Sequence, residues 1–292
     1  MESLVDILEA YFQDIVSIVT NLNSDNKGTT VIGPVPGRPT SEDEEIELDR
    51  ICEDTLQKWL ETSGYRIDLY SEHSIREIGN HDAQIQYLVT CDPFDGSGHF
   101  SRGIPSGWWS VLTVWDAAGF QPVLAGAIDV IRREMYIAQS ESVRLKSFDT
   151  GKSEVIFRSD EKELSNNIVI AAYLMNPDYL SNWVDKGSRL IHVMRDKFPK
   201  ARLWADGGSC IYPWLSRGVI DAYVMFDEPR SEVDPGLGFA WASQYPVYIV
   251  QKNGDVTNYC FEPGNGSKRI PWLVSACTDE LAQGIIEVLV GR

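Results

Sequence analysis

Cysteine and histidine are scarce in this sequence, and their distribution excludes several kinds of site. The 292 residues include five cysteines and four histidines. The cysteines are odd in number and widely spaced, and no two form a C-x-x-C pair, which argues against a zinc site, a disulfide framework or thiol redox chemistry. They are Cys52, Cys91, Cys210, Cys260 and Cys277. This pattern favours a protein of the reducing cytoplasm.

Positive charge is also in short supply. Lysine and arginine number 26 against 43 aspartates and glutamates, so the formal net charge is -17. Such a chain is expected to bind neither nucleic acid nor an anionic membrane through nonspecific electrostatic attraction. Any phosphate that it binds would therefore need a metal ion or backbone amides as local partners.

Long apolar runs are missing as well. The first 22 residues carry four acidic side chains among the apolar ones, which is incompatible with a secretory or transmembrane segment and predicts an amphipathic helix instead. The buried face of this helix is expected to contain Leu4, Ile7, Leu8, Tyr11, Phe12, Ile15 and Val19. With 43% hydrophobic and 24% charged residues and no repeat, the chain has the composition of a compact globular protein.

Residues 1–158 are predicted to form an α+β half of the chain. A second helix is expected to run from Thr40 or Ser41 to about Glu61, before a glycine that ends it. Alternating and continuous apolar stretches then predict strands, several of them in an antiparallel meander. These strands are expected over residues 65–74, 84–90, 108–116, 121–131 and 134–140.

Residues 159–292 are predicted to form an α/β half, because apolar strands alternate there with helices. No long linker separates it from the first half, so the two halves are expected to share one extended interface. The elements expected are a strand over 167–174, a helix over 179–198, a short strand over 201–204, a helix from Cys210 and a strand over 219–226.

The stretch "CDPFDGSGHF", residues 91–100, follows the buried strand "QIQYLVT" directly. Side chains three apart on an extended strand point to opposite faces, so Asp92 and Asp95 can converge only if the chain turns between them. Pro93 and Gly96 permit such a turn. The stretch is therefore either an ordinary Asx-type turn or a place where carboxylates gather around a cation.

Four carboxylates stand where the chain is expected to change direction, namely Glu72, Asp92, Asp95 and Asp234. Magnesium favours oxygen ligands of this kind, and Asp92, at the end of a strand, is the natural group to bridge two ions. The spacing excludes an EF-hand loop, and Ser97 stands where a cysteine-dependent phosphatase would need an arginine. "GGSCI" at residues 207–211 also lacks the second glycine of a serine-hydrolase elbow. Taken singly, each of these acidic residues is equally compatible with a turn or a helix cap.

The motifs together resemble the signatures of the inositol monophosphatase family, part of a magnesium-dependent, lithium-sensitive phosphatase superfamily that includes fructose-1,6-bisphosphatases. The first signature, D-P-[IL]-D-G-[ST] followed by phenylalanine and G-x-P, is matched by Asp92, Pro93, Asp95, Gly96, Ser97, Phe100 and "GIPS" at 103–106. The second, G-x-x-D-A-Y followed by W-D, is matched by Gly218, Asp221, Ala222, Tyr223 and Asp234. The resemblance covers nearly the whole chain and implies a layered αβαβα sandwich.

The resemblance also implies a site for two or three magnesium ions. Glu72, Asp92 and the backbone carbonyl of Phe94 would hold one ion, and Asp92, Asp95 and Asp234 a second.

The remaining roles that the resemblance implies concern the substrate and the attacking water. Gly96, Ser97 and Asp234 would contact the substrate, with the amides of the first two holding its phosphate. Ser97 and a carboxylate would orient a metal-activated water. That carboxylate is Asp49 or Asp43, and the separation from Glu72 favours Asp49.

Three departures from the family pattern leave the substrate open. The glutamate pair is replaced by Glu72-His73, the tryptophan before the last aspartate by Val233, and an acidic substrate contact by Met225, whose role Asp227 or Glu228 could take. The function expected is hydrolysis of a small phosphorylated polyol or sugar. The alternatives are a fructose-1,6-bisphosphatase, a nucleoside bisphosphate phosphatase, and a catalytically silent homologue that only binds. A bisphosphate would require basic groups such as Arg102, Arg217 or Arg230, and the family resemblance also implies a homodimer.

Overall fold

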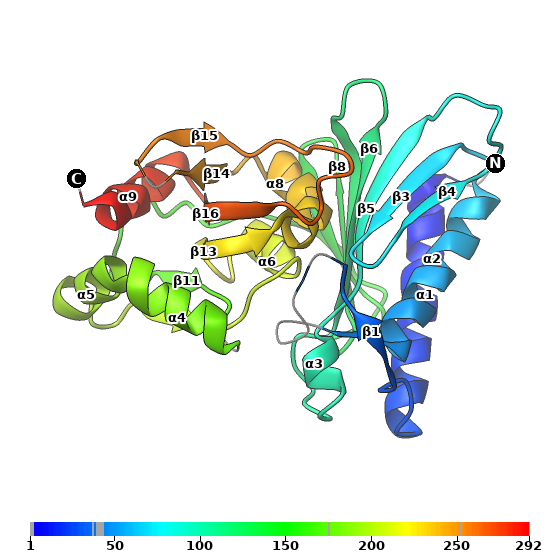
Figure 1. Ribbon diagram of the computed structural model, residues 1–292, viewed down its shortest axis with the longest axis horizontal. Helices are drawn as coiled ribbons and strands as arrows, with labels where there is room; N and C mark the ends of the chain where they lie inside the picture. The colour runs from blue at the N-terminus through cyan, green and yellow to red at the C-terminus, as the bar shows by residue number, and fades with distance from the viewer. Residues whose placement is uncertain (1–2, 37, 39–43, 175, 252, 292) are drawn as a thin grey trace.

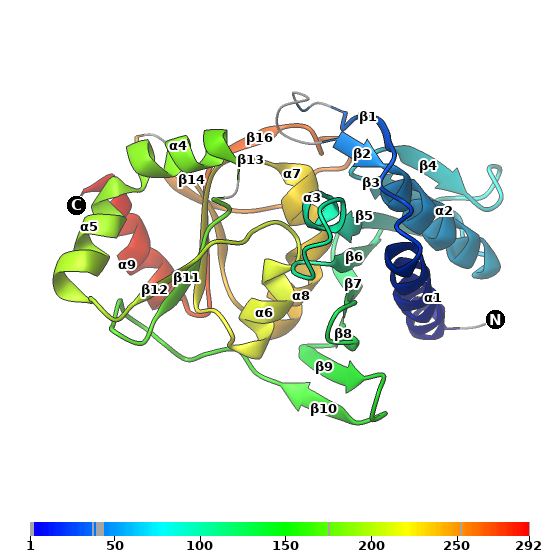
Figure 2. The same cartoon turned by 90° about the horizontal axis from the view of Figure 1, so that it is seen from below.

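Five layers of alternating helices and sheets make up the structure, a computed structural model that describes residues 3–36, 38, 44–174, 176–251 and 253–291. Figure 2 shows the layers in order: α1 and α2, a first sheet, α6 and α8, a second sheet, and finally α4, α5 and α9. The two ends of the chain lie at opposite sides of the molecule (Figure 1). This is the αβαβα sandwich expected from the sequence.

The first layer consists of two helices and a small hairpin. Helix α1 (Leu4–Ser24) begins at a capping box between Ser3 and Asp6, and every residue of its predicted face is buried except Leu4, which is half-buried. Helix α2 spans Glu47–Thr62. Its start differs from the prediction, because residues Glu44–Ile46 form strand β2, which pairs with β1 (Val31–Pro34). Thr40 and Ser41 lie outside the described residues.

The first sheet has eight strands in the order β10-β9-β8-β7-β6-β5-β3-β4. Every neighbouring pair is antiparallel except β3 and β5; the predicted meander is confirmed in β6 to β8, and it continues into β9 and β10, which the sequence did not predict. The strands are β3 (Ile67–Ser71), β4 (Ile75–Ile78), β5 (Tyr87–Asp95), β6 (Trp109–Asp116), β7 (Pro122–Asp129), β8 (Glu134–Gln139), β9 (Ser142–Ser147) and β10 (Ser153–Ile156).

Both faces of the first sheet are buried. On β6, Leu112 and Val114 pack toward α1 and α2, whereas Trp109, Val111 and Trp115 pack into the core shared with the second sheet. This alternation of side chains is the ordinary consequence of the strand repeat. The sheet thus lies between two apolar cores. Strand β3 leads into Glu72, and β5, which pairs with β6, contains Asp92 and Asp95.

The second sheet has six strands in the order β12-β11-β13-β16-β14-β15. Strands β11 and β12 run parallel to their neighbours, and the other pairs are antiparallel. The helix predicted over 179–198 is two helices, because the chain breaks at Gly187. The elements are β11 (Val169–Ala171), α4 (Pro177–Lys186), α5 (Ser188–Lys197), β12 (Arg202–Trp204), β13 (Ala222–Pro229), β14 (Val247–Val250), β15 (Val256–Asn258), β16 (Arg269–Ala276) and α9 (Asp279–Val290).

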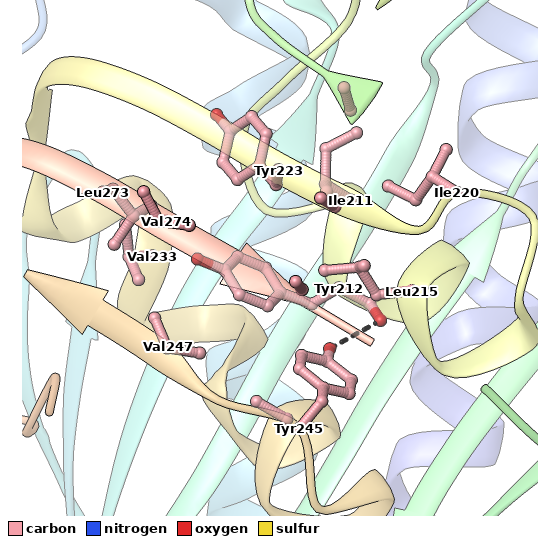
Figure 3. Close-up of a cluster of buried hydrophobic side chains, with 14 of the residues drawn as sticks. Ile211, Tyr212, Leu215, Ile220, Tyr223, Val233, Tyr245, Val247, Leu273 and Val274 are labelled. Atoms are coloured by element: carbon pink, nitrogen blue, oxygen red, sulfur yellow. Dashed lines mark hydrogen bonds between the residues drawn. The ribbon is translucent and has the colours of Figure 1, made fainter. Parts of the chain in front are cut away.

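Short helices fill the space between the sheets. They are α3 (Ser97–Phe100), α6 (Ile211–Arg217), α7 (Arg230–Val233), the 3-10 turn Asp234–Gly236 and α8 (Leu237–Ser243). Figure 3 shows the Tyr212 ring of α6 extending toward Val233 of α7, and the Tyr245 hydroxyl donates to the Tyr212 carbonyl at 2.9 Å. Val233 is wholly buried, so this cluster fixes how α7 is rotated.

The segment after α7 is fastened to the first sheet by hydrogen bonds. Thr90 and Thr113 donate from β5 and β6 to the carbonyls of Asp234 and Pro235, at 3.0 and 2.6 Å. The core of the second sheet also includes side chains of the first sheet, so the predicted interface is extensive. The boundary at 158/159 stays a prediction. None of the helices in the described ranges is both long enough and apolar enough to cross a bilayer.

Candidate functional site

A cavity of about 230 Å³ opens where the ends of β3 and β5 meet α3, α7 and the loop before α6. It brings together seven of the eight residues proposed from the sequence; Asp234 is the exception. Its lining contains Arg38, Asp49, Glu72, His73, Asp92, Phe94, Asp95, Gly96, Ser97, Gly98, His99, Arg102, Gly107, Tyr173, Tyr179, Asp206, Gly207, Gly208, Glu228 and Glu232.

A β-bulge brings Asp92 and Asp95 to the same face of the sheet. Asp92 pairs with Val111 and Asp95 with Trp109, so three steps on β5 oppose two on β6. Val111 and Trp109 face the same core, and residues directly opposite on paired strands share a face. The extra residue therefore cancels the alternation that would have separated the two carboxylates. The strand thus continues through the motif to Asp95, and a bulge takes the place of the turn expected from the sequence.

The Asp92 carboxylate is buried, and only one of its two oxygens accepts a hydrogen bond. Its side chain is 2% exposed, Oδ2 accepts a hydrogen bond from Ser209 Oγ at 3.0 Å, and Oδ1 has no hydrogen-bond partner. Burial raises the pKa of Asp92 well above its usual value, and the nearby carboxylates of Asp95, Glu72 and Glu232 add to the effect. A buried oxygen of this kind needs a proton or a cation.

Asp95 is held by the loop before α6. Its Oδ2 accepts from Ser209 Oγ at 3.2 Å and from the Cys210 amide at 3.1 Å. Burial raises the pKa of Asp95, and Glu232 is the largest electrostatic contributor. Ser209 therefore bridges Asp92 and Asp95 from the second half of the chain. Sequence reasoning missed this residue, because it had tested "GGSCI" only as a hydrolase motif.

Glu232 is a further carboxylate of the cavity lining, beside the predicted Glu72, Asp92 and Asp95, and the sequence motifs did not point to it. A Cβ placed on Gly208 would lie 3.0 Å from both Asp95 Oδ2 and Glu232 Oε2, so both carboxylates lie beside this glycine and act on each other electrostatically. Gly208 has φ +84°, a conformation that favours glycine. Glu232 stands two residues before Asp234. Because the W-D motif is altered here, Glu232 was the nearest other acidic residue that could have been considered for the role of Asp234.

Asp234 is not in the lining of this cavity, unlike Glu72, Asp92 and Asp95. It is 3% exposed, accepts a hydrogen bond from the Tyr259 hydroxyl at 2.7 Å, and lines an adjoining cavity whose lining also contains Glu72 and His73. Burial raises its pKa to about 7. Residues two apart on a helical turn differ by roughly 200° in direction. Glu232 accordingly lines the first cavity and Asp234 the adjoining one, on either side of the buried Val233.

Asp49 and Ser97 form a hydrogen-bonded pair inside the cavity. Ser97 Oγ lies 2.5 Å from Asp49 Oδ1 and 3.1 Å from the Phe94 carbonyl oxygen. The other carboxylate oxygen of Asp49 accepts from the Ile46 amide at 2.7 Å, which anchors it in the first turn of α2. The geometry is that of a carboxylate orienting a hydroxyl. Asp43, the alternative, lies outside the described residues.

Gly96 is required by the backbone between β5 and α3. Its φ is +101°, and a Cβ there would lie 2.1 Å from the Gly107 carbonyl oxygen. The first amides of the following helix have no partner within the helix and are available to an anion. Because α3 spans four residues, these amides rather than a helix dipole would hold a phosphate.

We expect Gly96→Ala to destabilise the protein by at least about 2 kcal/mol, because the methyl group meets backbone rather than a movable side chain. Gly98→Ala is the matched control, since a Cβ at Gly98 meets nothing within 4 Å. Urea unfolding of both variants measures the difference. Equal stabilities would show that the loop at Gly107 moves freely.

The donor set suits a hard cation, although the carboxylates do not enclose one in this arrangement. Within the described ranges, no three His, Cys, Asp or Glu side chains are grouped closely enough to hold a metal ion. Asp92 Oδ1 nevertheless has no hydrogen-bond partner, and the negative charges of Asp95, Glu72 and Glu232 act on the Asp92 carboxylate. Oxygen donors of this kind with an unsatisfied buried anion fit magnesium rather than zinc.

No protein-family model matches the chain, but two curated proteins are similar to it in sequence. Fructose-1,6-bisphosphatase from Schizosaccharomyces pombe is 27% identical over 176 residues, which cover 54% of this chain and 48% of that protein. Fructose-1,6-bisphosphatase/inositol-1-monophosphatase from Thermococcus kodakarensis is 30% identical over 138 residues, 44% of this chain and 50% of that protein. The chain thus spans about half the length of the curated relatives it matches.

The fold is similar over nearly the whole chain to solved structures. One of these, described as an inositol monophosphatase-fructose 1,6 bisphosphatase, superposes with a TM-score of 0.71 at 20% identity, covering 98% of this chain and all of that chain. The likeness shows the layered sandwich. The resemblance that the motifs suggested is therefore confirmed in sequence and in fold.

Proposed function

We propose that this chain is a magnesium-dependent phosphomonoesterase that acts on a small phosphorylated polyol or sugar. The observation that supports this most directly is Asp92 Oδ1, a buried carboxylate oxygen without a hydrogen-bond partner that lies in the field of three more carboxylates. Like charges in a buried site are costly unless a cation is present. Similarity to fructose-1,6-bisphosphatase and inositol-1-monophosphatase gives the chemistry that such a cation serves.

The residues that would hold magnesium are Glu72, Asp92, Asp95 and the Phe94 carbonyl, with Glu232 in the position that the sequence assigned to Asp234. All five line the cavity. Magnesium bound there supplies positive charge for the phosphoryl oxygens and makes a water more acidic. The number of ions, two or three in our proposal, follows from the family resemblance.

Asp49 and Ser97 would orient the attacking water. Asp49 Oδ1 accepts a hydrogen bond from the Ser97 hydroxyl, so the lone pairs of Ser97 Oγ are left to accept a hydrogen bond from the water. The Ile46 amide prevents the Asp49 carboxylate from rotating away. The amides at Gly96 and Ser97 would bind the phosphate itself.

We expect Ser97→Ala to lower kcat by about 10² to 10³ and to change the magnesium dissociation constant by less than about twofold, because the hydroxyl orients water and does not bind the metal. Steady-state rates and calorimetric magnesium titration separate the two effects. Ser101→Ala, in the exposed residue that caps α3, is the control and should match the wild type. Equal losses of rate and of affinity would place Ser97 among the metal ligands.

The far wall of the cavity favours an uncharged, hydroxyl-rich leaving group. The rings of Tyr173 and Tyr179 form a T-shaped pair with their centroids 5.2 Å apart. Glu228 Oε2 is buried without a hydrogen-bond partner. The other oxygen of Glu228 accepts from the Tyr223 hydroxyl at 2.6 Å, and burial raises the Glu228 pKa to about 8. In the resembling family an acidic residue at the position of Met225 contacts substrate hydroxyls. Met225 is buried in β13, and we propose that Glu228 makes this contact instead.

A second phosphate group finds little support on that wall. Of the three arginines considered for this purpose, Arg102 alone is in the cavity lining. Arg217 is paired with Glu134 at 2.6 Å, and Arg230 lies over the Tyr259 ring at 4.5 Å. Because Arg102 alone of these three arginines could meet a second phosphate, we favour a monophosphate over a bisphosphate.

Phosphate release from inositol 1-phosphate, fructose 1,6-bisphosphate and adenosine 3′,5′-bisphosphate, with magnesium and with a chelator, tests the function. Magnesium-dependent release from the first compound above the two bisphosphates is the expected result. Release from none, together with a magnesium-induced rise in Tm, would favour the silent homologue. A cytoplasmic homodimer is the remaining proposal from the resemblance, and light scattering after size-exclusion chromatography would measure its mass.

A further inference from the structure

A guanidinium group lies between two carboxylates of the cavity. Arg38 Nη2 is 2.8 Å from Glu232 Oε1 and forms a second ion pair with Glu72 Oε1. The same nitrogen donates to Ser231 Oγ at 3.2 Å. Arg38 belongs to the connection between β1 and β2, so it reaches the end of β3 and helix α7 from a distant part of the chain.

All three charged side chains of this bridge are largely excluded from water. The exposed fractions are 4% for Arg38, 8% for Glu72 and 17% for Glu232. Withdrawing such charges from water is costly and is compensated only when partners of opposite sign are in contact. In a cavity rich in carboxylates, the arginine therefore compensates two negative charges that would otherwise repel each other.

The bridge leaves the inner part of the acidic cluster uncompensated. Asp92 Oδ1 keeps no hydrogen-bond partner, although burial and three neighbouring carboxylates act on it. A guanidinium carries one charge on a planar fork that suits carboxylates at its edge. A divalent cation carries twice the charge and collects several oxygens around one point.

We infer that Arg38 is an internal counter-ion that occupies the cation position between Glu72 and Glu232 in the metal-free protein and competes there with the divalent ion. The inference rests on the proposed function for the identity of that ion. Arg38 holds the Oε1 atoms of Glu72 and Glu232, so a metal can coordinate those oxygens only if Arg38 leaves, and while it stays it offsets part of the negative charge that attracts the metal. The arginine thus stabilises the unloaded protein and weakens metal affinity.

Calorimetric titration with MgCl₂ tests this competition in the wild type, Arg38→Gln, Arg38→Lys and Arg102→Gln. Arg102 is an exposed arginine in the lining of the same cavity, so its replacement removes the same charge without the Arg38 bridge. We expect Arg38→Gln to bind magnesium about tenfold more tightly than Arg102→Gln, a difference of about 1.4 kcal/mol. Arg38→Lys should fall between Arg38→Gln and the wild type, because an ammonium group does not match the planar fork.

Melting in the presence of a chelator provides a second readout that involves no turnover. Without Arg38 the metal-free protein should melt several degrees lower, and its gain in Tm on adding magnesium should exceed that of Arg102→Gln. Magnesium affinity equal to, or weaker than, that of Arg102→Gln would overturn the inference.

The closing comparison separates this inference from the proposed function. If wild-type and Arg38→Gln proteins both fail to bind magnesium, the inference is overturned and the metal is also removed from the proposed function. If the wild type releases phosphate with magnesium but Arg38→Gln shows unchanged affinity, the inference alone is overturned.

Discussion

Replacing Asp92 by asparagine should abolish magnesium-dependent phosphate release while leaving the protein folded. The amide has nearly the same shape, and its oxygen can still accept the hydrogen bond from Ser209. The charge that would hold the cation is lost, and stabilisation worth several kcal/mol in the transition state goes with it, so we expect a rate loss greater than about 10².

The same substitution should stabilise the metal-free protein. Because burial and nearby carboxylates raise the Asp92 pKa, the folded state is penalised for the charged form as pH rises above the ordinary aspartate pKa. A neutral amide removes this penalty. The Tm in chelator should therefore rise, and the further rise on adding magnesium should shrink.

Asp129→Asn is the matched control for this experiment. Asp129 is 4% exposed, lies at the end of β7 in the same sheet, and is absent from the cavity lining. Its carboxylate accepts from the amides of Ile131 and Arg132, so the variant should lose some stability but keep its activity. An Asp92→Asn protein that retained more than about a tenth of the wild-type rate would contradict the metal-binding role.

Glu232→Gln and Asp234→Asn should have opposite consequences, although the two positions are two residues apart. The first variant removes a carboxylate that lies, like that of Asp95, beside Gly208 inside the cavity, and it should lower phosphate release by more than about 10². The second changes a side chain that is held by Tyr259 outside that cavity. Asparagine can accept the same hydrogen bond, so activity should stay within about threefold of the wild type.

Magnesium titration of the two variants gives an independent measurement. Affinity should fall with Glu232→Gln and remain with Asp234→Asn. The reverse pattern would restore Asp234 as the fourth carboxylate and would require α7 to be rotated relative to the buried Val233. Circular dichroism of both proteins confirms that neither result comes from unfolding.

Local sequence patterns were sufficient wherever the relevant interactions are short in range. The buried face of α1 follows from side chains three and four apart, and the meander follows from apolar stretches between turn residues. The Asp92–Ser97 motif was identified because its turn, glycine and aspartates lie within six positions. The early start predicted for α2 was wrong at Glu44–Ile46, since pairing with β1 determined that segment.

The sequence by itself determined the α+β and α/β halves, the motif on β5 and the acidic chemistry near it, and the resemblance of its motifs to a known family implied the layered fold. Only the tertiary structure decided which carboxylates share the cavity, because that depends on contacts between residues more than a hundred positions apart. Ser209 reaches Asp92 and Asp95 from the loop before α6, and Arg38 reaches Glu232 across the molecule. Glu232 rather than Asp234 faces Asp95 because the packing of Val233 fixes the rotation of α7. No local pattern encodes that rotation, since it is set by the apolar cluster around Tyr212.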